Sequence, residues 1–95
     1  MAKKVVLWLV KGALRDDEWG QLVSFGKAFT SLEAAAKFVL KDYNGNCKIY
    51  DDPDKLPKEE WRAIAKDKCL QSPENGKWRV RIVWDISRQT IALDG

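Results

Sequence analysis

Few residues of this chain could carry out catalysis, and histidine is absent from the sequence. Without histidine, nucleophilic catalysis of the Ser-His or Cys-His kind is excluded. The two cysteines, Cys47 and Cys69, are too few for a structural zinc site built from cysteine and histidine ligands. Serine, lysine and carboxylate side chains are present, but no spacing brings a particular pair together. We therefore expect that the protein is not an enzyme and has no catalytic residues.

An acidic run, Asp51, Asp52 and Asp54, is the one candidate for a metal site. A calcium loop of the EF-hand type requires oxygen ligands at alternating positions, a central glycine and a glutamate as the last ligand. In this chain Pro53 interrupts the run, Lys55 follows it, and no such glycine is present. We expect the run to form a solvent-exposed turn, and we expect neither a metal ion nor another cofactor.

Basic and aromatic residues alternate near the carboxyl end of the chain, where Arg79 and Arg81 lie among tryptophans. Sheets that bind single-stranded nucleic acid carry basic and aromatic side chains on the same surface. In an extended strand, however, Trp78 and Trp84 point away from the arginines, so aromatic residues of neighbouring strands would have to join them. Single-stranded nucleic-acid binding through Arg79, Arg81 and nearby aromatic residues is therefore the alternative function. The basic residues of this region are Lys77, Arg79, Arg81 and Arg88.

The most informative segment is residues 5–10, which read Val-Val-Leu-Trp-Leu-Val. A strand with one solvent-exposed face alternates apolar and polar residues, whereas this segment is apolar at both parities. It is therefore predicted to be a strand in the interior of a sheet, with apolar side chains on both faces. What covers its second face is the main functional question that the sequence poses.

The first half of the chain predicts two strands and a helix. Residues 11–18, with a glycine and a charged cluster, are expected to form a loop, and residues 19–29 a second strand antiparallel to the first. Thr30 and Glu33 have the spacing of a capping box, which marks the start of a helix. Asn44-Gly45 is expected to end that helix. Its apolar stripe has helical spacing and comprises Leu32, Ala35, Ala36, Val39, Leu40 and Tyr43.

The second half predicts a short extended segment at residues 47–50 and a second helix that begins near Pro57. Residues 77–85 alternate strictly and form the clearest strand of the chain. Residues 87–89 are expected to close a hairpin that returns through residues 90–93. The order β-β-α-β-α-β-β predicts an α+β fold, in which one two-layer domain spans residues 1–95. We expect a mainly antiparallel sheet of four to five strands with two helices on one face.

Two helices of modest length cover one face of such a sheet, and Trp78 and Trp84 indicate which face that is. The opposite face then carries Arg79, Arg81 and Val83 beside one parity of the first strand, either Val6, Trp8 and Val10 or else Val5, Leu7 and Leu9. An apolar patch with an arginine rim has the composition of a protein-binding surface. The predicted partner is another protein, either a second copy or a different target. The predicted partner-binding residues are Val6, Trp8, Val10, Arg79, Arg81 and Val83.

The composition is that of a globular protein: 95 residues, 45% hydrophobic and 33% charged, with a formal net charge of +3. The apolar run near the start is shorter than a secretory signal requires, and no segment is long enough to cross a membrane. A cytoplasmic protein with reduced thiols is expected. In its general character the chain is similar to small phage- or mobile-element-encoded proteins, single short α+β domains without histidine or a catalytic motif. That similarity implies an inhibitor that binds and blocks a host complex.

Overall fold

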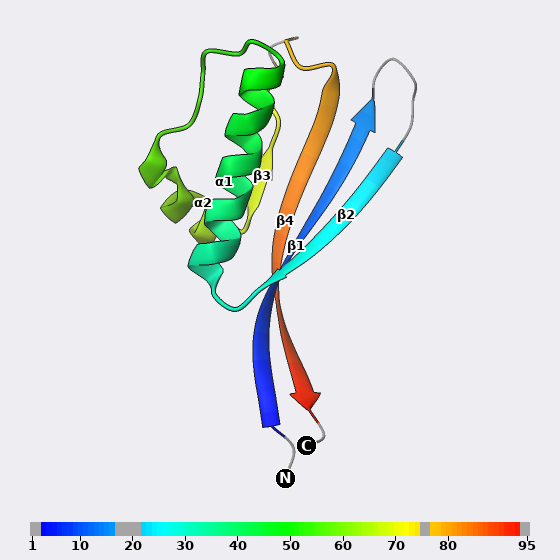
Figure 1. Ribbon diagram of the computed structural model, residues 1–95, viewed down its shortest axis with the longest axis vertical. Helices are drawn as coiled ribbons and strands as arrows, with labels where there is room; N and C mark the ends of the chain where they lie inside the picture. The colour runs from blue at the N-terminus through cyan, green and yellow to red at the C-terminus, as the bar shows by residue number, and fades with distance from the viewer. Residues whose placement is uncertain (1–2, 17–21, 75–76, 94–95) are drawn as a thin grey trace.

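The computed structural model describes residues 3–16, 22–74 and 77–93 of the chain. Four strands form one antiparallel sheet in the order β2-β1-β4-β3 (Figure 1), and two helices lie against one of its faces. The predicted α+β fold class, a sheet with two helices, is therefore confirmed. The elements are β1 (Lys3–Asp16), β2 (Leu22–Phe29), α1 (Leu32–Ile49), a 3-10 turn (Lys58–Glu60), α2 (Trp61–Asp67), β3 (Cys69–Gln71) and β4 (Val80–Leu93).

The hydrophobic core lies between the sheet and α1. Trp78 and every second residue of β4 from Val80 to Ile86 point toward the helices and are buried, as the strict alternation of this segment predicted. α1 covers them with its apolar stripe, which extends to Cys47, and Ile64 of α2 completes the core. The buried strand residues are Val10, Trp78, Val80, Ile82, Trp84 and Ile86.

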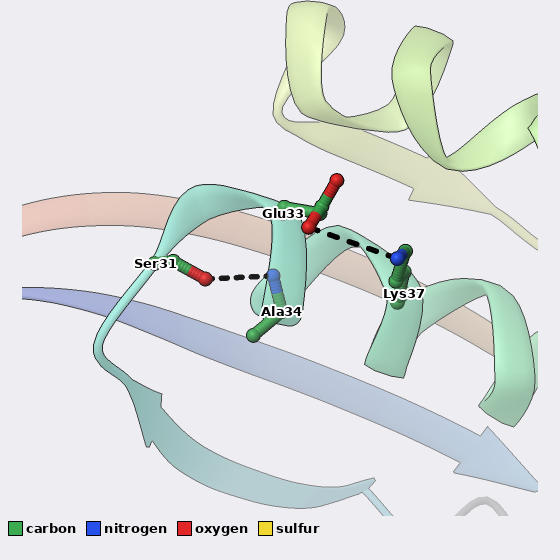
Figure 2. A network of polar contacts seen from close by, with 4 residues as sticks. All are labelled: Ser31, Glu33, Ala34 and Lys37. Carbon is green, nitrogen blue, oxygen red and sulfur yellow. Dashed lines mark hydrogen bonds and ion pairs between the residues drawn. The ribbon is translucent and has the colours of Figure 1, made fainter.

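The amino-terminal end of α1 differs by one residue from the predicted capping box. The hydroxyl of Ser31, and not Thr30, caps the helix by accepting a hydrogen bond from the backbone N–H of Ala34 at 3.1 Å (Figure 2). Glu33 is then only the second residue after the cap, one position short of the third position that a capping box requires. Its carboxylate instead pairs with Lys37 one turn later, with 3.7 Å between nitrogen and oxygen.

α1 continues past the predicted stop at Asn44-Gly45 to Ile49, so the expected extended segment at residues 47–50 is wrong. Local propensity is overridden here by tertiary contacts. The side chain of Asn44 donates to the carbonyl of Leu56 at 3.0 Å and accepts from its N–H at 2.9 Å, which fixes the following loop against the helix. Cys47, one turn further, is fully buried in the core.

β1 and β4 are longer than predicted because each is the other's partner. They pair in antiparallel register from Lys3↔Leu93 to Asp16↔Val80. Residues 11–16, expected in a loop, continue β1, and residues 87–93, expected in a hairpin, continue β4 as a single strand. The remaining loop residues 17 and 18, and residues 19–21 of the predicted second strand, lie outside the described residues. The short strand β3 was not predicted. It follows α2 directly, because Lys68 adopts a left-handed conformation with φ 56° and turns the chain.

β2 and β3 flank only part of this long pair. β2 joins β1 from Trp8 onward, and β3 joins β4 at residues 83–85. Residues 3–7 and 89–93 therefore form a two-stranded ribbon, here called the arm, which extends away from the helices (Figure 1). The molecule is elongated as a result, with principal extents of 53 × 31 × 18 Å.

Gly12 leaves room for the ring of Phe25, which packs against the core. It pairs with Phe25 on β2 and with Trp84 on β4, and a Cβ atom at position 12 would overlap the ring of Phe25. We expect Gly12→Ala to lower the free energy of unfolding by about 1–2 kcal/mol, since the ring must leave its place. Urea denaturation followed by circular dichroism measures this loss.

Gly26 provides the matched control, because a Cβ atom there meets only the carbonyl oxygen of Val10 at 3.9 Å. Gly26→Ala is expected to change the stability by less than about 0.5 kcal/mol. Equal losses in the two variants would contradict the proposed role of Gly12.

Candidate protein-binding face

The sheet has a second face that points away from the helices, here called the open face. Residues directly opposite each other in an antiparallel pair point to the same side. Since Trp84 and Ile86 point toward the helices, their neighbours Val83 and Asp85, and the residues paired with these, point the other way. No helix of the described residues packs on this face. Its apolar residues are Val5, Leu7, Leu9, Ala13, Leu22, Ala28, Val83 and Ile91.

The centre of the open face is an aliphatic strip along β1 and β4. Val5, Leu7 and Leu9 of β1 are only half-buried, although β1 is an interior strand of the sheet. On β4, Ile91 lies opposite Val5 and is 36% exposed; Val83, equally exposed, lies further along the same face, opposite Ala13. An aliphatic strip without a cover on an interior strand is typical of a binding surface.

The charges around this strip are mostly positive. Among the described strand residues that point to the open face, the only carboxylate is Asp85. Arg15 and Arg81 face each other across β1 and β4, and Lys11 is the neighbour of Asp85. This excess of positive charge favours a partner with acidic groups around an apolar surface. The four cations are Lys3, Lys11, Arg15 and Arg81.

A hollow of about 360 Å³ lies beside the aliphatic strip, where β1 and β2 carry small residues. Gly26, Ala13 and Ser24 form its floor, and Lys11 and Asp85 stand at its side. A side chain of a partner could enter this hollow and reach both an ammonium and a carboxylate group.

The structure does not bring the six predicted partner-binding residues together. Arg81 and Val83 do lie on the open face, but Val6, Trp8 and Val10 point to the side of the helices. Val10 is 0% exposed in the core, because its neighbour Ile86 is also covered by the helices, and it cannot contact a partner.

The other parity of the first strand, Val5, Leu7 and Leu9, is the one that the open face displays. Both parities are apolar, so sequence alternation could not distinguish them. Arg79 is exposed in a bend before β4. Arg79 and Arg81 each make an interaction of their own within the molecule.

The aromatic residues of the sheet are separated from Arg81. Trp8, Phe25, Phe29 and Trp84 all belong to the side of the sheet that faces the helices. In the part of the chain that the structure describes, the open face therefore combines basic with aliphatic side chains and carries no stacking platform of the kind that binds single strands.

The other chemically interesting side chains have structural roles. Asp52 is buried and not solvent-exposed as predicted: its carboxyl group accepts hydrogen bonds from Nε1 of Trp78 and from the backbone N–H of Asp54, each at 3.0 Å. Burial, and secondarily Asp52, raises the pKa of the Cys47 thiol, which is the opposite of what a nucleophile needs. Within the described ranges, no three side chains form a cluster that could hold a metal ion.

Comparisons of the chain with protein-family profiles, with curated proteins and with solved structures found no match. None of the described helices is both long and apolar enough to cross a membrane.

Proposed function

We propose that this protein is a non-enzymatic binding module that docks a different protein on its open face. The observation that carries the proposal is the uncovered aliphatic strip of Val5, Leu7 and Leu9 on an interior strand. A partner that presents an apolar patch with carboxylates around it would match both the strip and the positive rim.

The aliphatic strip can supply part of the free energy of binding. Complete burial of a valine or leucine side chain contributes about 1.5–3 kcal/mol, and the half-exposed residues of the strip still have part of that to gain. The summed gain from the strip residues exceeds the free-energy cost of ordering a few side chains, and it offsets part of the cost of association. Charges on the rim would mainly select the partner and speed the encounter.

We further propose that docking blocks the partner's own assembly, as for small inhibitors of the phage or mobile-element type. Such an inhibitor needs affinity and no chemistry, in agreement with a face that is apolar and basic. Cys47 and Cys69 are both free thiols, which is compatible with the cytoplasm as its place of action.

The test replaces Leu9, the residue of the strip nearest the hollow, by glutamate, which removes apolar surface and repels an acidic partner. Lys41→Gln on the exposed side of α1 is the control, since it changes the net charge by the same amount. Proteins retained from a bacterial lysate by the wild type are identified and purified, and their affinities for the three chains are measured by calorimetry. We expect Leu9→Glu to weaken binding about 100-fold, or about 2.7 kcal/mol, and Lys41→Gln to leave it unchanged.

Two outcomes would overturn the proposal. One is a partner that binds Leu9→Glu as tightly as the wild type while circular dichroism shows the variant folded. The other is retention of single-stranded oligonucleotide, with an affinity that falls steeply with salt and with Arg81→Ala, which would support the alternative function instead.

A further inference from the structure

One edge of β4 is left without a partner strand over its last seven residues. β3 pairs with residues 83–85, and the final bond on that side is from the N–H of Ile86 to the carbonyl of Lys68, at 2.9 Å. Beyond it, residues 87–93 have β1 on one side and no other described strand on the outer side (Figure 1). Backbone groups of alternate residues point to the same edge of a strand. Because the N–H of Ile86 points outward, those of Arg88, Thr90 and Ala92 do as well.

The arm that carries this edge is only two strands wide. A two-stranded ribbon is marginally stable in water. Val5, Val6 and Leu7 remain half-buried on its two faces. The arm would therefore gain stability from a further strand.

The two edges of the arm differ in their protection against such a strand. The edge of β1 carries Lys3 and Lys4, side chains that discourage strand addition. On the edge of β4, residues 87–92 contain no proline, glycine, lysine or carboxylate, and their one charged residue is Arg88. The open edge of β4 is thus the place where a strand can add.

We propose that a second copy of this protein adds its own β4 to this edge, antiparallel and around a two-fold axis at Thr90. The open stretch 87–93 is centred on Thr90, and Thr90 is also one of the residues whose backbone groups point outward. This register pairs Thr90 with Thr90 of the second copy, and Arg88 with its Ala92. It would form about six main-chain hydrogen bonds, two for each of three outward-facing pairs.

The side chains agree with this register. A Thr–Thr pair across two strands is favourable, whereas like charges directly opposite each other are unfavourable. Arg88 lies opposite Ala92 of the second copy and about 15 Å from the other Arg88, at ~3.4 Å per residue along the strand and about 5 Å between strands. Because the strands run in opposite directions, the helices of the two copies lie at opposite ends of the paired region.

This dimer goes beyond the proposed function, because the β4 edge is distinct from the open face. Strand addition keeps the parity of both copies, so the two open faces lie on the same side of one continuous sheet. Val5, Leu7 and Ile91 of the two copies then lie side by side on this face, with Ile91 of each copy opposite Gln89 of the other.

The first test uses proline, which removes a backbone donor and is tolerated where that N–H points away from the sheet. Thr90→Pro removes an outward N–H at the centre of the proposed interface. Ser24→Pro is the matched control, because the N–H of Ser24 points outward from the other edge of the sheet, on β2. Sedimentation equilibrium should give a dimer for the wild type and Ser24→Pro, and a monomer for Thr90→Pro.

The second test does not depend on the fold tolerating proline. In a Cys69→Ser background, Thr90→Cys places two thiols opposite each other with Cα atoms about 5.5 Å apart, within the range of a disulfide. Arg88→Cys on the same edge places the two Cα atoms about 15 Å apart. Oxidation should therefore cross-link Thr90→Cys into dimers and leave Arg88→Cys monomeric on a non-reducing gel.

A monomeric wild type at high concentration, or equal cross-linking of the two thiol variants, would overturn the dimer. If Thr90→Pro were still dimeric, the interface would lie on another surface, and the proposed β4 dimer would be wrong as well. Leu9→Glu, which tests the open face, should stay dimeric, so failure of the proposed function and failure of the dimer give different results.

Discussion

Trp84→Ala should lower the free energy of unfolding by about 3–5 kcal/mol, the usual loss when a buried tryptophan is truncated. Trp84 is the largest fully buried side chain among the described residues. Its ring centroid lies 5.9 Å from that of Tyr43, and its Nε1 donates to Oδ2 of Asp42 at 2.9 Å. Truncation therefore leaves a cavity between β4 and α1 and removes a hydrogen bond. Domains of this size have about 5–15 kcal/mol of stability in total, so a large part would be lost.

Urea denaturation followed by circular dichroism measures this loss, and Trp61→Ala provides the matched control. Trp61 is half-buried at the start of α2, where the ammonium group of Lys37 lies 5.2 Å from the centre of its ring. Its truncation leaves a space that water can fill, and we expect a loss of about 1 kcal/mol. If both variants were equally destabilised, Trp84 would not be the centre of the core.

Asp52→Ala should lower the free energy of unfolding by about 2–3 kcal/mol. The substitution leaves one side-chain donor and one backbone donor without an acceptor in a buried region. One donor is the indole N–H of Trp78, a residue that is itself buried between the rings of Tyr43 and Tyr50. The other is the backbone N–H of Asp54, which shapes the loop between the helices.

Asp52→Asn retains one acceptor oxygen and should cost about 1 kcal/mol. The control is Asp54→Ala, which removes an exposed carboxylate and keeps the backbone N–H, so that the stability should change by less than about 0.5 kcal/mol. If Asp52→Ala were as stable as Asp54→Ala, the buried hydrogen bonds would make no net contribution to the stability of the fold.

The proposed binding face and the proposed dimer arise from one feature, the length of the β1–β4 pair. Near the helices the pair is covered on one face and open on the other. At the arm it loses its neighbours on both edges as well. The same two strands thus offer a surface to a different protein and an edge to a second copy, and each can be disrupted without the other.

Much of this fold could be predicted from local patterns. The strict alternation around Trp78 and Trp84 correctly identified the face that the helices cover, since side-chain direction in a strand has a period of two. The apolar stripe of α1 was equally visible. What could not be predicted were the ends of the elements. α1 continues through Asn44-Gly45 because the side chain of Asn44 forms hydrogen bonds with the backbone of Leu56. That partner is distant in the sequence, so the local pattern does not indicate it.

By itself, then, the sequence determined that the chain folds into a sheet with two helices, and that the strand at residues 5–10 has apolar side chains on both sides. Only the tertiary structure decided which side remains open. Val10 goes into the core opposite Ile86, and Leu9 is left on the open face, because the register with β4 aligns the two strands in that way. A register is a relation between segments far apart in the sequence, and a segment that is apolar at both parities contains no local signal for it.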